Sequence, residues 1–153
     1  MDIEEQYDKI YRFCYYKVHS KEDAEDITQE AFLRFLCSGY EDQGKSLNLL
    51  YSIARNLCID EVRRRHPEAP LDMEVSDGGG FEDQVIEKTD LQRAIRSLSP
   101  EDQEILLLRF VNEEPLSLIS KLTGLSRFAL YRRISRLKKK LKEELREGGS
   151  FGE

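Results

Sequence analysis

Apolar residues in this sequence recur at steps of three and four wherever a regular pattern is present. That spacing places them on one face of an α-helix, whereas a half-buried strand would alternate at every second residue. Two such faces are Tyr7, Ile10, Cys14 and Val18, and then Ala24, Ile27, Ala31 and Phe35. No stretch alternates as a strand does, so the pattern predicts an all-α fold.

Capping residues mark helix boundaries in the same pattern. Ser20 and Ser99 each precede an acidic turn, and Pro100 suits the first position of the helix that Ser99 begins. That helix is expected to continue to Pro115, with Ile105, Leu108 and Val111 facing inward. Another helix is expected in LNLLYSIARNLCIDEVRRR, where one side carries Leu50, Ile53, Leu57 and Val62.

The regular pattern stops between His66 and about Phe81. Two prolines and the triplet at residues 78–80 occur there, and residues 67–90 carry eight Asp or Glu against one Lys. This composition is typical of a flexible linker, because it offers few apolar side chains to a core. The sequence therefore predicts a helical domain over residues 1–66, an acidic linker over 67–84 and a second helical domain over 85–147.

A short helix, a glycine and a longer helix follow Pro115. Gly124 can adopt the positive φ of a tight turn, and Ser126 can cap the helix after it. The residues expected to face inward are Leu116, Ile119 and Leu122 in the first helix, and Leu130, Ile134, Leu137 and Leu141 in the second. This arrangement is a helix-turn-helix.

The second helix of this motif is strongly basic, although the whole chain has a formal net charge of -6. Residues 127–146 contain nine Lys or Arg against two Glu. Away from the apolar stripe lie Arg127, Phe128, Tyr131 and Arg132, with Arg136 and residues 138–140 further along. A solvated amphipathic helix could carry the same charge, but the turn, the cap and the preceding short helix favour a DNA-recognition helix with phosphate contacts along its length.

Several other classes of protein find no support in the sequence. No apolar run approaches the roughly 18 residues of a membrane span, and the acidic start MDIEEQYDK differs from a signal peptide, so a cytoplasmic protein is expected. Cys14, Cys37 and Cys58 are interpreted as buried small apolar residues. His19 and His66 have no partner at a catalytic spacing, and no phosphate loop follows a strand, so we expect no enzyme activity, metal or cofactor.

Three stretches together resemble the extracytoplasmic-function (ECF) group of bacterial sigma factors, which keep regions 2 and 4 joined by a linker. YRFCYYKVHSKEDAEDITQEAFLRFL is similar to regions 2.1 to 2.2, and LLYSIARNLCIDEVRRR to regions 2.3 to 2.4. Region 4 is matched by LSPEDQEILLLRFVNEEPLSLISKLTGLSRFALYRRISRLKKKL. The resemblance covers nearly the whole chain and implies a region 2 helical bundle and a region 4 helix-turn-helix.

The resemblance also implies a function and a set of binding residues. The chain would bind core RNA polymerase through the β′ clamp helices and the β flap, and would recognise promoter DNA at its -10 and -35 elements. An anti-sigma factor is a further partner that the family suggests. The implied core-binding residues are Asp26, Gln29 and Glu30, and those for the -10 element are Arg55, Asn56, Asp60, Arg63 and Arg64. The -35 set is Ser126, Arg127, Phe128, Tyr131, Arg132 and Arg136.

The sequence departs from the family at a few positions. Leu49 stands where relatives usually carry a Trp, and Ser120, Ala129 and Tyr131 also differ from the common pattern. These differences leave the fold unchanged but put the details of -10 melting and the -35 preference in doubt. The alternative function is a helix-turn-helix regulator whose N-terminal domain senses a ligand or dimerises. A solvent-facing pair of Arg64 with Asp60 is the alternative to a DNA contact.

Overall fold

A computed structural model describes residues 2–38, 46–67 and 90–148 of the chain. All regular elements in these ranges are helical, which confirms the predicted all-α fold. The chain divides into two compact units, Met1–Val85 and Ile86–Glu153. The predicted linker over residues 67–84 lies outside the described residues apart from its first position, as do residues 85–89 at the start of the predicted second domain.

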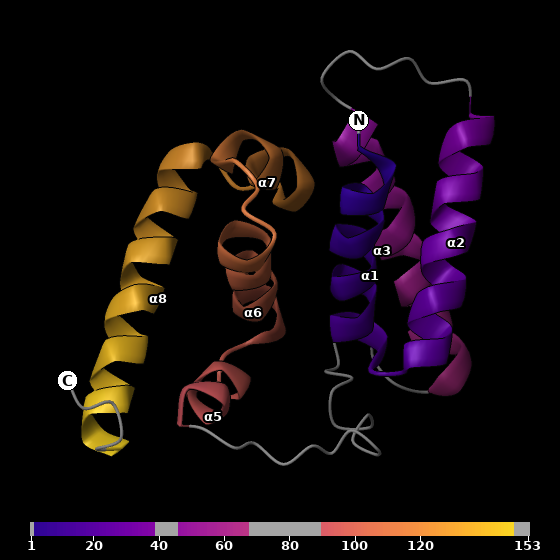
Figure 1. Cartoon of the computed structure of the whole chain (residues 1–153). Coiled ribbons are helices and arrows are strands. Elements are labelled where there is room, and N and C mark those ends of the chain that lie inside the picture. Colours follow the sequence, from indigo (N-terminus) through magenta and orange to yellow (C-terminus); the bar gives the residue numbers. More distant parts are fainter. Residues whose placement is uncertain (1, 39–45, 68–89, 149–153) are drawn as a thin grey trace. The chain divides into compact units, whose positions relative to one another are not determined.

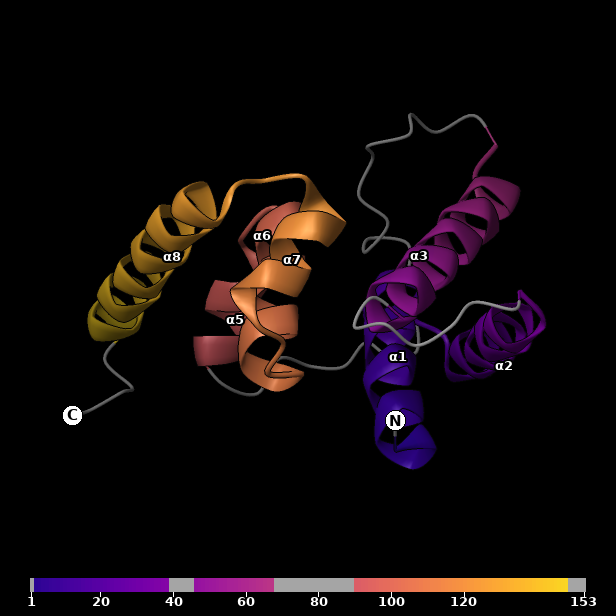
Figure 2. The same cartoon turned by 90° about the horizontal axis from the view of Figure 1, so that it is seen from above.

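The N-terminal unit is a bundle of three helices, α1 (Ile3–Val18), α2 (Lys21–Cys37) and α3 (Ser46–Arg65), seen from two directions in Figures 1 and 2. Each helix packs against the other two. The Ser20 hydroxyl accepts a hydrogen bond from the Asp23 amide at 3.2 Å, so the predicted cap begins α2. Only His19 and Ser20 separate α1 from α2, and His19 has a positive φ of 57° that reverses the chain.

The core of this bundle follows the predicted pattern on two helices and differs on the third. Ile10, Cys14 and Val18 of α1 are fully buried, and all four predicted residues of α2 are buried. On α3 the buried residues are Leu50, Tyr51, Ala54 and Cys58, whereas Ile53, Leu57 and Val62 are only half-buried. The predicted buried side of α3 was therefore wrong, because the observed buried side is rotated about the helix axis by about one residue. Small Ala54 and Cys58 let α3 approach closely, and the Tyr51 ring meets Phe13 edge to face at 5.2 Å.

The C-terminal unit contains α5 (Asp90–Arg96), α6 (Pro100–Leu106), the π-helical segment η1 (Leu107–Val111), α7 (Leu116–Thr123) and α8 (Arg127–Gly148). Helix α8 packs against α5, α6 and α7 (Figure 1). The predicted cap is confirmed at α6, where Ser99 Oγ accepts from the Asp102 amide at 3.1 Å and Pro100 occupies the first turn. Leu98, Leu106 and Leu137 form a cluster that joins α6 to α8.

The π-helical segment changes which residues face the core. We expected Ile105, Leu108 and Val111 to point inward, and the first two are fully buried. Val111 is 52% exposed, whereas Asn112 is 1% exposed. The wider turn carries the chain past the α-helical register. The prediction for Val111 was therefore wrong, because the pattern assumed an unbroken α-helix.

Candidate nucleic-acid interface

The turn between α7 and α8 is held by hydrogen bonds within the chain. Gly124 has a φ of 83° and closes α7, and its amide donates to the Ser120 carbonyl at 2.9 Å. Ser120 Oγ donates to the Leu125 carbonyl at 2.6 Å, and the Leu125 amide donates to Thr123 Oγ1 at 3.2 Å. Ser126 Oγ accepts from the Ala129 amide at 3.0 Å, which confirms the predicted cap. The start of α8 is thereby fixed in direction.

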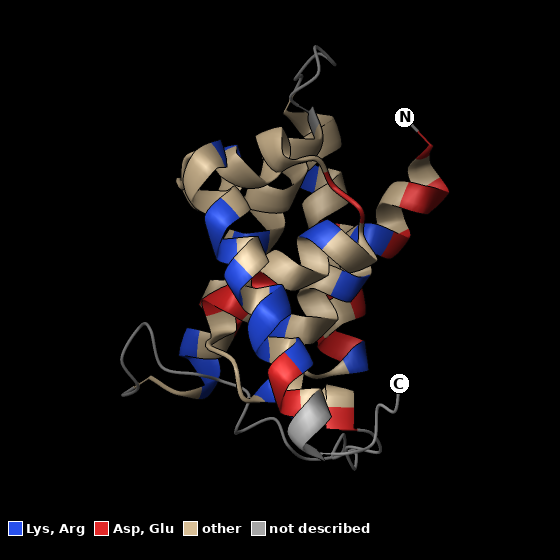
Figure 3. Cartoon of the chain, turned by 90° about the vertical axis from the view of Figure 1, so that its left-hand side faces the viewer, with Lys and Arg blue, Asp and Glu red and all other residues tan. Residues whose placement is uncertain are grey.

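Helix α8 separates its apolar and basic residues onto opposite sides. Leu130, Ile134 and Leu137 are buried, as the pattern predicted. All six residues of the predicted -35 set are exposed, namely Ser126, Arg127, Phe128, Tyr131, Arg132 and Arg136. Lys and Arg recur along α8 in Figure 3, which views the chain from the side on which α8 lies in Figure 1. The exposed face also includes Ser135, one turn beyond Tyr131, which the sequence reasoning did not single out.

One arginine of α8 is used to attach the helix. Arg133 Nε donates to Asp102 Oδ1 at 2.7 Å, and its Nη2 lies 3.1 Å from Glu101 Oε1, so the start of α6 is tied to α8. Burial alone would lower the pKa of Arg133, but hydrogen bonding to Asp102 and the charges of both carboxylates raise it. Sequence reasoning missed this role, because Asp102 was assigned only to the dipole of its own helix.

Helix α3 presents four of its five predicted -10 residues to solvent. Asn56, Asp60, Arg63 and Arg64 are exposed, and their spacing of four, three and one residues keeps them on one side of the helix. Arg55 is half-buried and has interactions of its own within the chain. Leu49, at the position where the family usually has a Trp, is half-buried near the start of α3.

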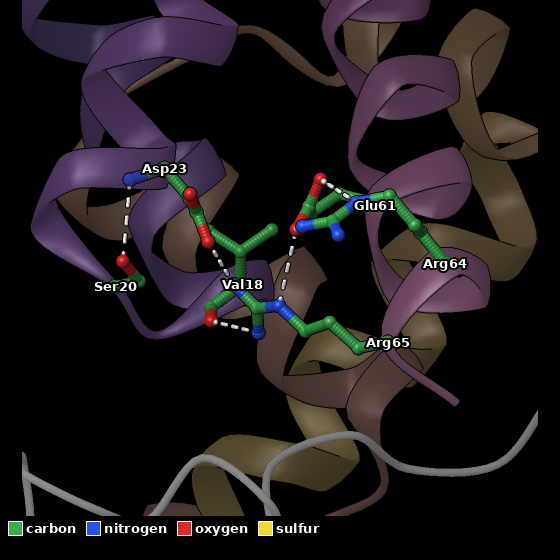
Figure 4. Close-up of polar contacts among 6 residues, drawn as sticks. All are labelled: Val18, Ser20, Asp23, Glu61, Arg64 and Arg65. Carbon is green, nitrogen blue, oxygen red and sulfur yellow. Dashed lines mark hydrogen bonds and ion pairs between the residues drawn. The ribbon is translucent and has the colours of Figure 1, made fainter.

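The C-terminal end of α3 is fastened to the turn between α1 and α2 by Arg65 (Figure 4). Its guanidinium donates to the Val18 carbonyl at 2.9 Å and to Glu61 Oε2 at 3.2 Å, and it also forms an ion pair with Asp23. These three acceptors come from the end of α1, the start of α2 and α3 itself. Arg65 therefore fixes the end of the helix on which Arg63 and Arg64 lie.

Arg64 has an ion-pair partner, but it differs from the one that the sequence suggested. Its Nε lies 3.2 Å from Glu61 Oε1, and a second nitrogen contacts the other oxygen of that carboxylate. The hydrogen bond and the charge of Glu61 raise the pKa of Arg64. Because 70% of the Arg64 side chain is exposed, this pairing leaves the guanidinium accessible to another anion. Asp60, the partner that the sequence suggested, lies one residue before Glu61 and is exposed.

Helix α2 carries the predicted polar face and an apolar continuation of it. Asp26 and Gln29 are exposed, and Glu30 is half-buried with its carboxylate 2.8 Å from Arg34 Nε. Leu33 and Leu36, which the sequence reasoning missed, are 57% and 65% exposed. Asp26, Gln29, Leu33 and Leu36 follow each other at steps of three, four and three, so they form one stripe on the outer side of α2.

The three cysteines differ in their burial. Cys14 and Cys58 are buried as predicted, and a hydrogen bond from Cys58 lowers the pKa of Cys14. Cys37 is exposed, so its prediction as a buried residue was wrong. Across residues 2–38, 46–67 and 90–148, no group of His, Cys, Asp or Glu could hold a metal ion. In the same ranges, no helix combines the length and the apolar composition that crossing a bilayer requires.

Comparison with known proteins decides the family. The model of sigma-70 region 2 matches residues 3–68, and the model of sigma-70 region 4 matches residues 88–141. The chain is 30% identical to the ECF RNA polymerase sigma factor SigW of Bacillus subtilis. Their alignment spans 158 residues and covers 92% of this chain and 84% of SigW. This chain is a member of the ECF sigma factors.

A second relative agrees with this assignment, and a solved structure shares the fold. The ECF RNA polymerase sigma factor BldN of Streptomyces coelicolor is 32% identical over 158 residues, covering 91% of this chain and 58% of BldN. The sigma factor RpoE of Bartonella quintana, solved in complex with the anti-sigma factor NepR, has the same fold, with a TM-score of 0.65 and 19% identity over 92% of both chains.

As an ECF sigma factor, the protein binds core RNA polymerase and directs it to specific promoters. The predicted family and function are thus confirmed. The alternative, a regulator with an N-terminal sensing or dimerisation domain, is wrong because the N-terminal unit matches region 2.

Proposed function

We propose that this sigma factor uses three exposed helix faces for three binding steps. Asp26, Gln29 and Glu30 of α2 bind the clamp helices of the β′ subunit. The -10 element is bound by Arg55, Asn56, Asp60, Arg63 and Arg64 of α3, and the -35 element by Ser126, Arg127, Phe128, Tyr131, Arg132 and Arg136 of α8. The observation that carries this proposal is that α2, α3 and α8 each bury one side in a core and present most of these side chains on the other.

The α2 face suits a helical partner. Its stripe of Asp26, Gln29, Leu33 and Leu36 has the spacing with which one helix packs along another. The two polar residues provide directional hydrogen bonds, and the two exposed leucines provide apolar area that water would otherwise contact. The clamp helices of β′ are therefore a suitable occupant. The C-terminal unit would contact the β flap, as the family resemblance implies.

The α3 face suits separated DNA strands. Asn56 offers an amide donor and acceptor for a base edge, Asp60 offers an acceptor, and Arg63 and Arg64 supply positive charge for the phosphate backbone. Arg64, whose side chain is 70% exposed, would exchange Glu61 for a phosphate at small cost, because surface ion pairs contribute about 0–1 kcal/mol.

The proposal extends to the organisation and setting of the protein. Region 2 would occupy residues 1–66 and region 4 residues 85–147, with residues 67–84 as the connection. The protein would act in the cytoplasm and would perform no covalent chemistry. An anti-sigma factor is a proposed partner, and the complex of Bartonella quintana RpoE with NepR supports this.

A binding assay with core polymerase tests the assignment of α2. The variant with Asp26→Ala, Gln29→Ala and Glu30→Ala should bind core at least about tenfold more weakly, since each lost charge-assisted hydrogen bond contributes roughly 1.5–3 kcal/mol. Its circular dichroism should not change, because exposed substitutions rarely alter stability by more than about 0.5 kcal/mol.

The matched control replaces Glu4 and Asp8 of α1 by Ala, which removes the same two negative charges from another exposed surface. This control should bind core as the wild type does. Equal affinity of the α2 variant and the control would overturn the assignment of α2.

A further inference from the structure

Helix α8, the proposed recognition helix, carries a strongly exposed aromatic side chain. Phe128 is 69% exposed, more than any other large apolar side chain among the residues that the structure describes. It lies in the first turn of α8, which is where a recognition helix approaches base edges. The ring therefore stands where it can contact an apolar group in the major groove.

Arg132, one turn later, is stacked over this ring. Its Cζ atom lies 5.0 Å from the ring centroid of Phe128, within the range of a cation–π interaction. Within the described residues, Arg132 forms no hydrogen bond or ion pair. The guanidinium thus lies over an aromatic ring, and its N–H groups stay available to a base. Such stacking restricts the side chain before DNA binds and reduces the entropy lost in a bidentate contact.

This geometry relates two neighbouring base pairs. An arginine that donates to guanine O6 and N7 lies roughly in the plane of that base. A ring stacked on the guanidinium therefore lies at the level of the next base pair, since successive base pairs are separated by about 3.4 Å. In the major groove, the apolar group at that level is the C5-methyl group of thymine.

We propose that Phe128 and Arg132 act as one unit that reads a guanine and an adjacent thymine in the -35 element. Arg132 donates to the guanine, and Phe128 contacts the thymine methyl group. The proposal rests on the proposed function of α8 as the -35 reader. A cytosine in place of the thymine is disfavoured, because its amino group would lose water against an aromatic ring that offers only a weak acceptor.

The experiment measures competition among promoter duplexes with a randomised -35 element, using holoenzyme reconstituted from core polymerase and each sigma variant. The wild type should select guanine beside an A·T pair. Arg132→Lys keeps the charge but loses the planar fork, so the guanine preference should fall by about tenfold or more. Phe128→Ala should lose the preference for the A·T pair. Lys139→Ala, further along α8, is the control and should weaken all sequences alike.

A second arm isolates the methyl group on the selected duplex. Replacing the thymine by deoxyuridine removes only that group and should weaken wild-type binding by about fourfold, the equivalent of one buried methyl. Phe128→Ala should bind the two duplexes equally. The substitutions lie on exposed side chains, so the variants should fold as the wild type does.

The outcomes separate this proposal from the one on which it rests. If wild-type holoenzyme selects no -35 sequence, the assignment of α8 fails, and this inference fails with it. If a sequence is selected but Arg132→Lys keeps the guanine preference, or Phe128→Ala still distinguishes thymine from deoxyuridine, only the paired readout is overturned.

Discussion

At the scale of single residues, Glu113 is the one non-glycine residue within 90–148 that has a positive φ. Its φ is 56°, a value that residues with a Cβ atom rarely adopt. Its neighbours hold it there: Asn112 and Glu114 are buried, and the Glu114 carbonyl accepts from Arg109 at 3.1 Å. The strain at Glu113 is therefore imposed by the turn between η1 and α7.

Glu113→Gly should stabilise the C-terminal unit. Glycine adopts positive φ without the steric penalty that a Cβ atom brings. Relief of this penalty exceeds the cost of glycine's greater freedom in the unfolded chain, so we expect the free energy of unfolding to rise by about 0.5–1 kcal/mol. Chemical denaturation of the full chain measures the change. Glu113→Ala is the control, because it removes the same exposed carboxylate but keeps Cβ; an equal gain in both variants would show that charge, and not backbone strain, is responsible.

Arg65 should contribute more to stability than its neighbour Arg64. Arg65→Ala removes the donor to Val18, Asp23 and Glu61, and only 23% of the Arg65 side chain is exposed, so the loss should be about 1–2 kcal/mol. Arg64→Ala is the matched control on the same helix and should cost less than about 0.5 kcal/mol, because the Arg64 side chain is 70% exposed and solvent weakens its ion pair with Glu61. Urea unfolding of both variants makes the comparison, and similar losses would contradict the role given to Arg65.

At the scale of elements, α8 depends on α6 for its attachment. Arg133→Met keeps the aliphatic stem but removes the contacts to Asp102 and Glu101, and we expect the C-terminal unit to lose about 1–2 kcal/mol. Arg136→Met, one turn along and exposed, should change the free energy of unfolding by less than about 0.5 kcal/mol. Thermal unfolding distinguishes the two, and an unchanged Arg133→Met variant would show that the apolar cluster alone holds α8.

The elements also show which features a sequence reveals. The caps at Ser20, Ser99 and Ser126 were predictable, because each hydroxyl binds an amide three residues away. Arg65 was not, because its partners lie 42 and 47 residues away and are adjacent only in the folded bundle.

Register within a helix was harder to predict than its presence. The π-helical segment η1 shifted Val111 outward because backbone hydrogen bonds, which no side-chain pattern records, set its turn. On α3, the helix was predicted but its buried side was not, since small Ala54 and Cys58 carry a weaker apolar signal than Leu57.

Residues of the candidate interfaces were likewise predictable where a local pattern determines them, and were missed where tertiary contacts do. The basic face of α8 could be found from spacing, because solvent-facing residues repeat at helical steps, whereas the candidate residues of α2 and α3 were implied by the family resemblance. The exposure of Phe128 also followed from its place away from the apolar stripe, whereas that of Leu33 and Leu36 could not be predicted, since an apolar residue in a sequence is expected to be buried. These side chains carry the apolar part of the proposed binding faces.

At the scale of the whole molecule, acidic and basic residues are unevenly distributed among the helices. The polar face of α2 in the N-terminal unit contains carboxylates, whereas α8 in the C-terminal unit is basic despite the net charge of -6. The Lys and Arg residues of α8 complement DNA phosphates, as do Arg63 and Arg64 at the end of α3. The overall charge of the chain therefore does not oppose promoter binding.

Transcription in vitro from genomic promoter fragments tests the central claim, that three exposed faces carry polymerase and promoter binding. Core polymerase is supplied with the wild type, with the α2 triple variant, with Asn56→Ala and Asp60→Ala together, with Arg127→Ala and Arg132→Ala together, or with the Glu4 and Asp8 control. We predict discrete transcripts with the wild type and the control, and at least about tenfold less transcript with each face variant. Transcripts that do not depend on the protein, or face variants as active as the control, would contradict the account.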